Sequence, residues 1–129
     1  MSKAMLLGAP GGPEALSWED VADRAPAAGE VAVRQTAVGV NFIDTYFRSG
    51  IYAWPESPLV VGAEAAGVVE SVGADVVSVK PGDRVAYTTP LGAYRERRLI
   101  AADRLVRLPA TISDEIAATV MLKGLTVQY

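Results

Sequence analysis

The stretch EVAVRQTAVGV (residues 30–40) gives the strongest strand prediction in the chain. Val31 and Val33 mark one face of a strand, because alternate side chains of a strand point to the same side. From Val38 onward the apolar residues continue in the opposite phase. A change of phase by one residue is typical of a β-bulge, which we place near Gln35–Thr36.

Further short segments of strand-like composition surround this one, and Gly- and Pro-rich turns separate them. The sequence Lys80-Pro81-Gly82-Asp83, for example, has Pro and Gly at the two central positions of a type II turn. Many short strands between turns favour a barrel or a sandwich, so the sequence predicts a mainly β fold with short helices. The other expected strands are Ala4–Leu7, Ala15–Val21, Glu64–Val72, Arg84–Tyr87, Ala93–Ile100 and Leu105–Leu108.

Two segments are expected to be helical. Phe42–Ser49 forms one or two turns that end at Gly50. Pro109–Glu115 has the composition of a helix start, in which Thr111 and Asp114 resemble a capping box. The apolar positions that then recur at steps of 3 and 4 are Ala118, Met121, Leu122, Leu125 and Tyr129.

Composition excludes several classes of function. The chain has 129 residues, of which 50% are hydrophobic and 21% charged, as in a globular domain. Its net charge of −3 argues against a nucleic-acid or anionic-membrane partner, since both are bound mainly by basic surfaces. The chain has no Cys and no His, so it lacks disulfides, the two commonest zinc ligands and any Ser-His or Cys-His pair. No run is long and apolar enough to span a membrane, and a cytoplasmic location is the default expectation.

The common phosphate-binding motifs are absent. The chain contains neither G-x-G-x-x-G nor G-x-x-x-x-G-K-[ST]. Gly62 and Gly67 have a suggestive spacing, but no Lys follows, and a strand rich in small residues explains them better. A phosphate-rich ligand therefore has no obvious binding loop within these residues.

Several polar residues follow the segment 30–40 in apolar surroundings. Asn41 either caps the helix that follows it or serves a site. Asp44 either satisfies a turn or pairs with Arg48, its i,i+4 neighbour. Tyr46 and Tyr52 are more often core aromatic residues with a hydroxyl at the rim than catalytic acids.

Glu64 and Lys123 lie in similarly apolar runs. A buried carboxylate is costly without a partner, so Glu64 is paired to an Arg, lines a cleft or faces solvent. Lys123 lies on the solvent face of its helix or near a ligand, and the adjacent Gly124 favours close approach of a ligand or backbone.

Taken together, these segments resemble one family. Residues Asn41–Tyr52 are similar to the signature of the zinc-free quinone oxidoreductases, the zeta-crystallin-like branch of the medium-chain dehydrogenase/reductases. The resemblance runs through the whole chain in order and spacing. Four further segments match the family: Gly11–Glu14, Gly62–Val69, Pro81–Val85 and Leu122–Thr126.

The resemblance implies a GroES-like β-barrel catalytic domain over residues 1–112. Residues 113–129 then begin the helix that leads to a Rossmann nucleotide-binding domain, which is absent here, so we expect a truncated part of a longer enzyme. Zinc-dependent relatives place Cys at the position of Asn41 and His at that of Ala63, so no zinc is expected. Glu64 then has a structural role as a hydrogen-bonded or ion-paired carboxylate.

The implied activity is hydride transfer from NADPH to a quinone or a related conjugated carbonyl. Without zinc, hydrogen-bond donors must stabilise the charge that develops on the acceptor oxygen, and by resemblance these are Asn41, Tyr46 and Tyr52. The resemblance assigns no residue as the obligatory proton donor, because solvent can supply the proton, and the preference for NADPH over NADH is taken from the family alone. The residues that the resemblance places near the cofactor are Asn41, Phe42, Asp44, Tyr46, Lys123, Thr126 and Tyr129.

Two other functions stay open. A GroES-like domain can serve as a stand-alone binding or oligomerisation module, because fold does not fix function. An enoyl or alkenal reductase of the same superfamily would share these motifs. In the enzyme interpretation, the partner is a small quinone or enone, and the chain forms a homodimer or an adventitious oligomer through uncovered apolar surface.

Overall fold

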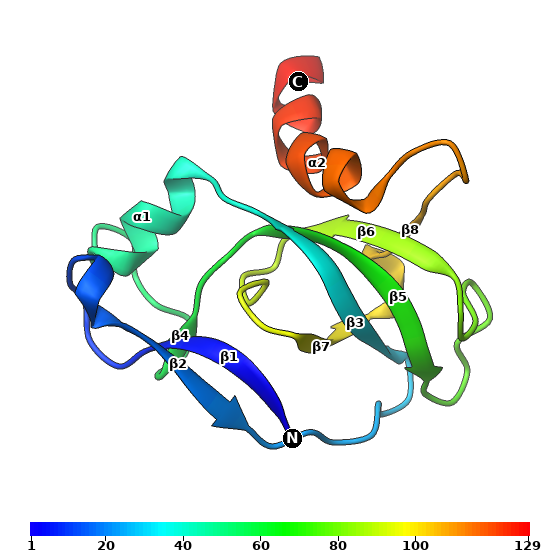
Figure 1. Ribbon diagram of the computed structural model, residues 1–129, viewed down its shortest axis with the longest axis horizontal. Coiled ribbons are helices and arrows are strands. Elements are labelled where there is room, and N and C mark those ends of the chain that lie inside the picture. Colours follow the sequence, from blue (N-terminus) through cyan, green and yellow to red (C-terminus); the bar gives the residue numbers. More distant parts are fainter.

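The computed structural model describes residues 1–129 and is mainly β, with two α-helices (Figure 1). Two short 3-10 turns, Pro13–Ala15 and Ala102–Arg104, join strands. No helix is long and apolar enough to cross a membrane. The main elements are β1 (Ser2–Leu7), β2 (Leu16–Val21), β3 (Glu30–Gly39), α1 (Phe42–Arg48), β4 (Leu59–Val60), β5 (Glu64–Val72), β6 (Arg84–Thr88), β7 (Arg97–Ala101), β8 (Val106–Arg107) and α2 (Asp114–Gln128).

The strands form two separate antiparallel sheets, in the orders β2-β1-β4 and β7-β3-β5-β6-β8. The predicted closed barrel is therefore wrong, although the mainly β class is confirmed. The reason lies at the seam, where a single bridge between Ala4 and Arg95 replaces a continuous ladder. The backbone N–H of Met5 also donates to the carbonyl of Tyr94. These few bonds hold the sheets together without closing them.

Strand β3 has the predicted bulge. Its pairing with β5 shifts register between Gln35 and Ala37, where the sequence pattern changed phase. Val31 and Val33 before the shift are fully buried, whereas Val38 beyond it is exposed. A second register shift, between Ala32 and Val33, is not indicated by the pattern of apolar residues in the sequence. Because a bulge increases local twist, β3 bends where it approaches α1.

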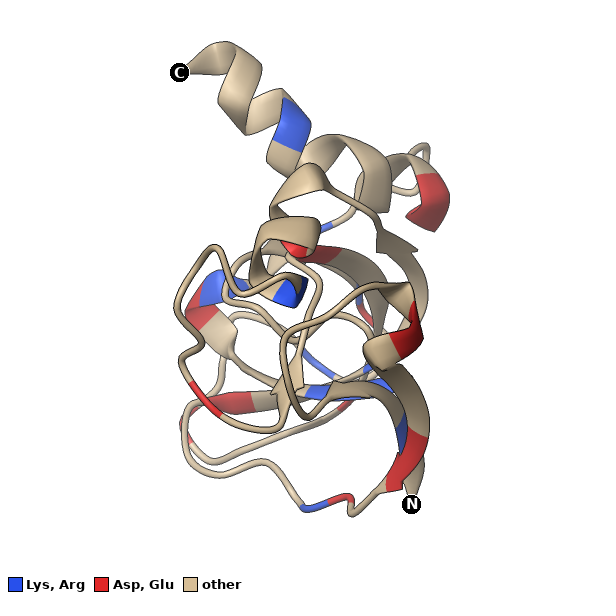
Figure 2. Ribbon diagram, turned by 90° about the vertical axis from the view of Figure 1, so that its left-hand side faces the viewer, with Lys and Arg blue, Asp and Glu red and all other residues tan.

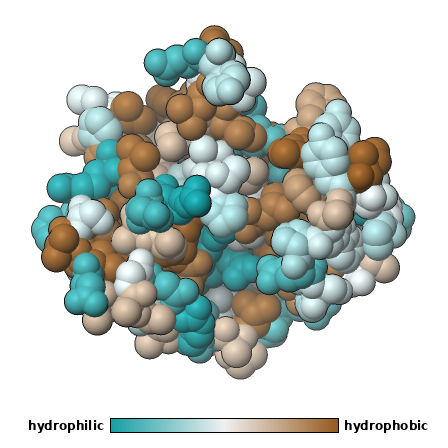
Figure 3. Space-filling model, turned by 180° about the vertical axis from the view of Figure 1, so that it is seen from behind, coloured by the Kyte–Doolittle hydropathy of each residue, from teal (hydrophilic) through white to brown (hydrophobic).

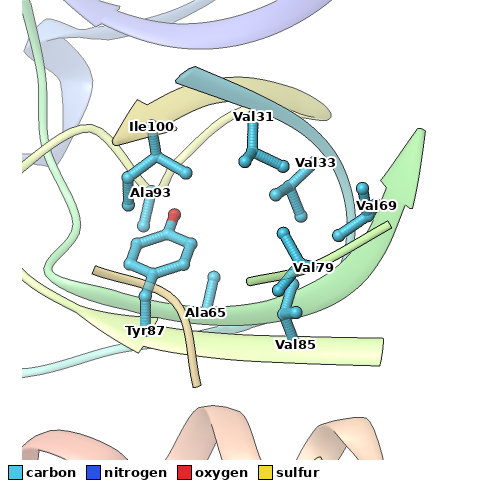
Figure 4. Close-up of a cluster of buried hydrophobic side chains, with 9 residues drawn as sticks. All are labelled: Val31, Val33, Ala65, Val69, Val79, Val85, Tyr87, Ala93 and Ile100. Atoms are coloured by element: carbon cyan, nitrogen blue, oxygen red, sulfur yellow. The ribbon is translucent and has the colours of Figure 1, made fainter. Parts of the chain in front are cut away.

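The five-stranded sheet is buried on both faces. Figure 4 shows one face, where the Tyr87 ring lies among valines and its hydroxyl donates to Gln35. On the other face, α2 packs on small side chains: Ala117 and Ala118 contact Ala66 and Ala86. Small residues on both surfaces bring the helix backbone close to the sheet. A Cβ built on Gly39 would lie 2.1 Å from the carbonyl oxygen of Ala118, so this approach requires glycine.

Some predicted boundaries are wrong. The expected strand Ala93–Ile100 begins only at Arg97, because Ala93 and Tyr94 donate their N–H groups to the loop before β5. The expected strand Leu105–Leu108 shortens to Val106–Arg107. The type II turn is confirmed, with φ of +90° at Gly82.

The predicted cap of α2 is also wrong. The cap is Ser113, whose hydroxyl accepts the N–H of Ile116 at 3.2 Å. Asp114 does not reach back to Thr111, because Arg84 and Thr36 occupy its carboxylate. The helix therefore starts where its first acidic side chain is attached to the sheet.

Candidate functional site

Asn41 stands at the junction between β3 and α1, and its side chain points away from the helix it precedes. The N–H of Asn41 donates to the Asp44 carboxylate at 2.9 Å, and its carbonyl accepts the N–H of Asp44 at 3.1 Å. The carboxamide makes no capping bond. The backbone of Asn41 thus begins the helix, and its side chain is left for other contacts.

Glu64, the first residue of β5, has no exposed surface, and both oxygens of its carboxylate accept hydrogen bonds. Its carboxylate accepts the Asn41 amide at 2.9 Å, the Lys123 ammonium at 2.9 Å and the backbone N–H of Leu122 at 2.7 Å. Of the alternatives for Glu64, pairing is the one found, with Lys123 in place of the expected Arg. A buried charge in an apolar strand is tolerated because it is both paired and hydrogen-bonded.

Lys123 is held on α2 rather than free on a solvent face. Its Nζ also donates to Oδ1 of Asn41 at 2.8 Å, while 53% of the side chain stays exposed. Asn41, Glu64 and Lys123 come from three elements and form one polar cluster, named here the Asn–Glu–Lys cluster. Elsewhere, Lys and Arg are interspersed with Asp and Glu and do not gather on one face (Figure 2).

The Asn–Glu–Lys cluster lies beside a groove of about 540 Å³ between the start of α1 and the second half of α2. Lys123 is the charged residue in its lining, and most of the remaining surface is apolar. Of the predicted cofactor residues, the groove brings together Asn41, Phe42, Lys123 and Thr126. The lining residues are Val40, Asn41, Phe42, Ile43, Leu122, Lys123, Thr126 and Val127.

Asp44 does not line the groove. It is 4% exposed and accepts the Tyr94 hydroxyl at 2.9 Å, so the alternative pairing with Arg48 is not found. Arg48 instead donates to the carbonyl of Gly11 at 3.2 Å. Burial raises the pKa of Asp44, against the hydrogen bonds from Asn41 and Tyr94, which lower it. Asp44 therefore anchors α1 to the loop before β7.

Tyr94 was not identified from the sequence. Burial, and the neighbouring charge of Asp44, raise the pKa of its hydroxyl, so it acts as a hydrogen-bond donor. The signal that would have identified it is Gly62, whose φ of +98° and missing Cβ leave room for the Tyr94 ring. The glycine indicates a close approach at position 62, but the sequence does not show that the approaching residue is Tyr94.

The three predicted tyrosines lie outside the groove lining. Tyr46 and Tyr52 are 39% and 45% exposed, and their rings meet edge to face with their centroids 5.5 Å apart. Tyr129, the last residue, is fully exposed. Thr126 lines the groove, but its hydroxyl donates to the carbonyl of Leu122 at 2.8 Å within the helix. The groove chemistry therefore centres on the amide and the ammonium.

The positions that carry zinc ligands in zinc-dependent relatives hold Asn41 and Ala63 here. No group of three His, Cys, Asp or Glu side chains that could hold a metal ion is found. The carboxylate of Glu64 is bonded to Lys123, and Oδ2 of Asp44 accepts the Tyr94 hydroxyl.

Comparison with known families identifies the domain. Residues 27–110 match the family model described as the alcohol dehydrogenase GroES-like domain. The chain belongs to this family. Its match covers the strands from β3 to β8, and with them Asn41 at the β3–α1 junction and Glu64 at the start of β5.

Individual relatives of this GroES-like chain are oxidoreductases. It is 53% identical to a quinone oxidoreductase of Pseudomonas aeruginosa and 44% identical to a 2-haloacrylate reductase of a Burkholderia species, over 100% of this chain and 40% of each relative. It is also similar to the crystal structure of Escherichia coli quinone oxidoreductase complexed with NADPH, with a TM-score of 0.95, 47% identity and coverage of 98% of this chain and 39% of that one. The chain thus spans about 40% of the length of these relatives.

The groove combines apolar walls with a few polar groups. Its apolar walls and its amide and ammonium suit a planar ring with polar substituents. The glycines that closely approach other atoms are not free for phosphates, because Gly39 contacts Ala118, Gly62 contacts Tyr94 and Gly67 contacts Arg34. The groove therefore offers apolar walls and hydrogen-bond donors, and these glycines form no phosphate-binding loop.

Proposed function

We propose that this GroES-like domain is the substrate-facing part of a zinc-independent oxidoreductase that transfers hydride from NADPH to a quinone or a related conjugated carbonyl. The observation that carries the proposal is the similarity of nearly the whole chain, at a TM-score of 0.95, to a quinone oxidoreductase complexed with NADPH. The groove beside the Asn–Glu–Lys cluster supports it, because it combines apolar walls with two hydrogen-bond donors.

The role of the protein in this reaction is to bind, orient and stabilise charge. NADPH, when bound, supplies the hydride. Negative charge then develops on the carbonyl oxygen of the acceptor, and the Asn41 amide and Lys123 ammonium act as donors to it. Phe42 and Val127 are apolar residues of the groove lining, against which a ring of the acceptor can pack. Tyr46 and Tyr52 are placed by the proposal at the outer rim, where an extended acceptor reaches them.

We assign the phosphates of NADPH to a nucleotide-binding domain beyond these residues. In this proposal, residues 1–112 are the catalytic domain and residues 113–129 begin the helix that connects the two domains in a cytoplasmic enzyme. A short helix that carries Lys123 would then link the nucleotide to the groove. The residues proposed to lie near the cofactor are Asn41, Phe42, Asp44, Tyr46, Lys123, Thr126 and Tyr129.

The proposal is tested by the oxidation of NADPH with 1,4-benzoquinone, followed by the loss of NADPH absorbance. The protein encoded by the complete reading frame is compared with residues 1–129. We expect turnover by the complete protein and none above background by residues 1–129, because the phosphate-binding residues lie outside this chain. Comparable turnover by both would contradict the proposal that a second domain binds the phosphates of NADPH. No turnover by the complete protein would contradict the proposed activity.

A second candidate is the reduction of an activated alkene. The 44% identity to a 2-haloacrylate reductase favours it, since the two chemistries share hydride delivery to a conjugated carbonyl system. The charges of Lys123 and Glu64 cancel, so the groove suits a neutral acceptor better than a carboxylate. A panel of quinones, enones and 2-haloacrylate, ranked by kcat/KM, separates the two candidates.

A further inference from the structure

Glu64 accepts hydrogen bonds from both donors of the groove, Asn41 and Lys123, without lining the groove itself. Its side chain has no exposed surface and is not part of the groove lining. One carboxylate oxygen, Oε1, accepts from Nδ2 of Asn41 and from Nζ of Lys123, each at 2.9 Å. The other, Oε2, accepts the N–H of Leu122 on α2 at 2.7 Å. One side chain therefore fixes residues from the β3–α1 junction and from α2.

The charges in the Asn–Glu–Lys cluster determine the orientation of the Asn41 amide. Its nitrogen faces a carboxylate, which only accepts, and its oxygen faces an ammonium, which only donates. Rotation of the amide by 180° would place oxygen against oxygen and nitrogen against nitrogen. Asn41 therefore has one orientation as long as Glu64 is ionised and Lys123 is in place.

The remaining donors can be counted. Lys123 has three N–H bonds and uses two of them, on Asn41 and Glu64. Asn41 has two on Nδ2 and uses one, on Glu64. One N–H of each residue has no protein partner, and both residues line the groove. These two donors come from neighbouring side chains of the groove lining, so both are available to a bound acceptor.

We propose that Glu64 is a positioning residue that fixes the Asn41 amide and the Lys123 ammonium, and with them the free N–H groups that these side chains present to the acceptor. This inference rests on the proposed function and adds to it a residue that touches neither acceptor nor cofactor. Donors that are fixed before the reaction stabilise developing charge without rearrangement, so they lower the barrier more than they strengthen binding. Glu64 then affects kcat through Lys123 and Asn41.

The kinetic test uses the complete protein and the variant Glu64→Gln, which keeps the size and loses the charge. We expect kcat to fall about 10–100-fold while KM for NADPH and for the quinone changes by less than about threefold. The matched control is Glu70→Gln, on the same strand but exposed and bonded to Arg97, which should keep wild-type kcat. An unchanged kcat in Glu64→Gln, or a loss confined to KM, would overturn the inference.

A double-mutant cycle with Lys123→Met separates positioning from general structural damage. If Glu64 acts through its hydrogen-bonded partners, Glu64→Gln lowers kcat by a clearly smaller factor in the Lys123→Met background than in the wild type, and the effect that remains there reflects Asn41. A purely structural role gives additive losses in kcat and overturns the inference. The thermal unfolding midpoint gives a second measurement: Lys123→Met strands a buried carboxylate and should lower the midpoint, and adding Glu64→Gln should restore part of it.

Failure of the proposed function has a different signature. A wild-type protein without NADPH-dependent turnover refutes the proposed function, and it also refutes the role of Glu64 toward an acceptor. Its unfolding cycle would still report whether Glu64 and Lys123 are coupled. An active wild type with additive variants refutes the role of Glu64 alone.

Discussion

Gly62 lies between β4 and β5 with φ of +98°, a conformation that favours glycine. A Cβ at this position would lie 2.3 Å from Cδ1 of the Tyr94 ring, far inside normal contact distance. Tyr94 in turn donates to the buried carboxylate of Asp44, which holds the first turn of α1. The position of α1, and with it one wall of the groove, therefore depends on a residue that has no side chain.

The substitution Gly62→Ala is expected to destabilise the protein by about 2–4 kcal/mol, because the strained φ and the displaced Tyr94 ring both add to the cost. The control is Gly82→Ala, which has φ of +90° but no atom within 4 Å of the new Cβ, and should cost about 1 kcal/mol. Urea unfolding measures both. Equal losses in the two variants would show that the Tyr94 contact contributes nothing.

At the scale of elements, one carboxylate attaches the first turn of α2 to the five-stranded sheet. Asp114 in its first turn accepts from Arg84 on β6 at 2.6 Å and 3.0 Å, and from Thr36 on β3 at 2.6 Å. Burial raises the pKa of Asp114, but the hydrogen bonds from Thr36 and Arg84 outweigh it and lower the pKa below the ordinary value of 3.8. The ionised carboxylate thus connects the helix with two strands.

A lowered pKa in the folded protein means that Asp114 contributes stability above pH 3.8, and that this contribution is lost as the pH falls below that value. Asp114→Asn should therefore destabilise the protein by about 1–3 kcal/mol at pH 7 and by less at pH 3. Urea unfolding at the two pH values measures this. The exposed neighbour offers a control, Glu115→Gln, which should cost about 0.5 kcal/mol or less at both. A pH-independent loss in Asp114→Asn would contradict the assignment.

At the scale of the whole molecule, α2 presents apolar side chains to solvent. Ile116, Val120 and Leu125 are each about half exposed, and Val127 is 88% exposed. In Figure 1 the last turns of α2 rise away from the sheet, and Figure 3 shows apolar side chains gathered at that end of the molecule. Apolar surface of this kind favours association.

Light scattering over a concentration series of residues 1–129 distinguishes the enzyme proposal from a stand-alone oligomeric module. Contact through the α2 surface alone should give weak association that rises with concentration and decreases in Leu125→Gln. The control Glu115→Gln lies on the same helix and should leave the association unchanged. A fixed stoichiometric ring at all concentrations would favour the stand-alone module instead.

Strand prediction from the sequence succeeded where the pattern is local. The limits of β5 and the bulge of β3 follow from alternation and its change of phase. Prediction failed where distant segments compete for the same groups. The backbone before β7 bonds to the loop preceding β5, so the predicted strand Ala93–Ile100 starts late. The predicted capping box between Thr111 and Asp114 does not form, because Arg84 on β6 binds the Asp114 carboxylate.

By itself, the sequence determined the mainly β class, the GroES-like family and the importance of Asn41, Glu64 and Lys123, since composition, alternation and motifs are properties of neighbouring residues. Tertiary structure alone decided that these three side chains meet, across 23 and 59 positions of sequence. It also decided that the two sheets do not close and that Tyr46 and Tyr52 lie outside the groove lining. The physical reason is that a hydrogen bond between distant residues depends on how the elements pack, which local periodicity does not specify.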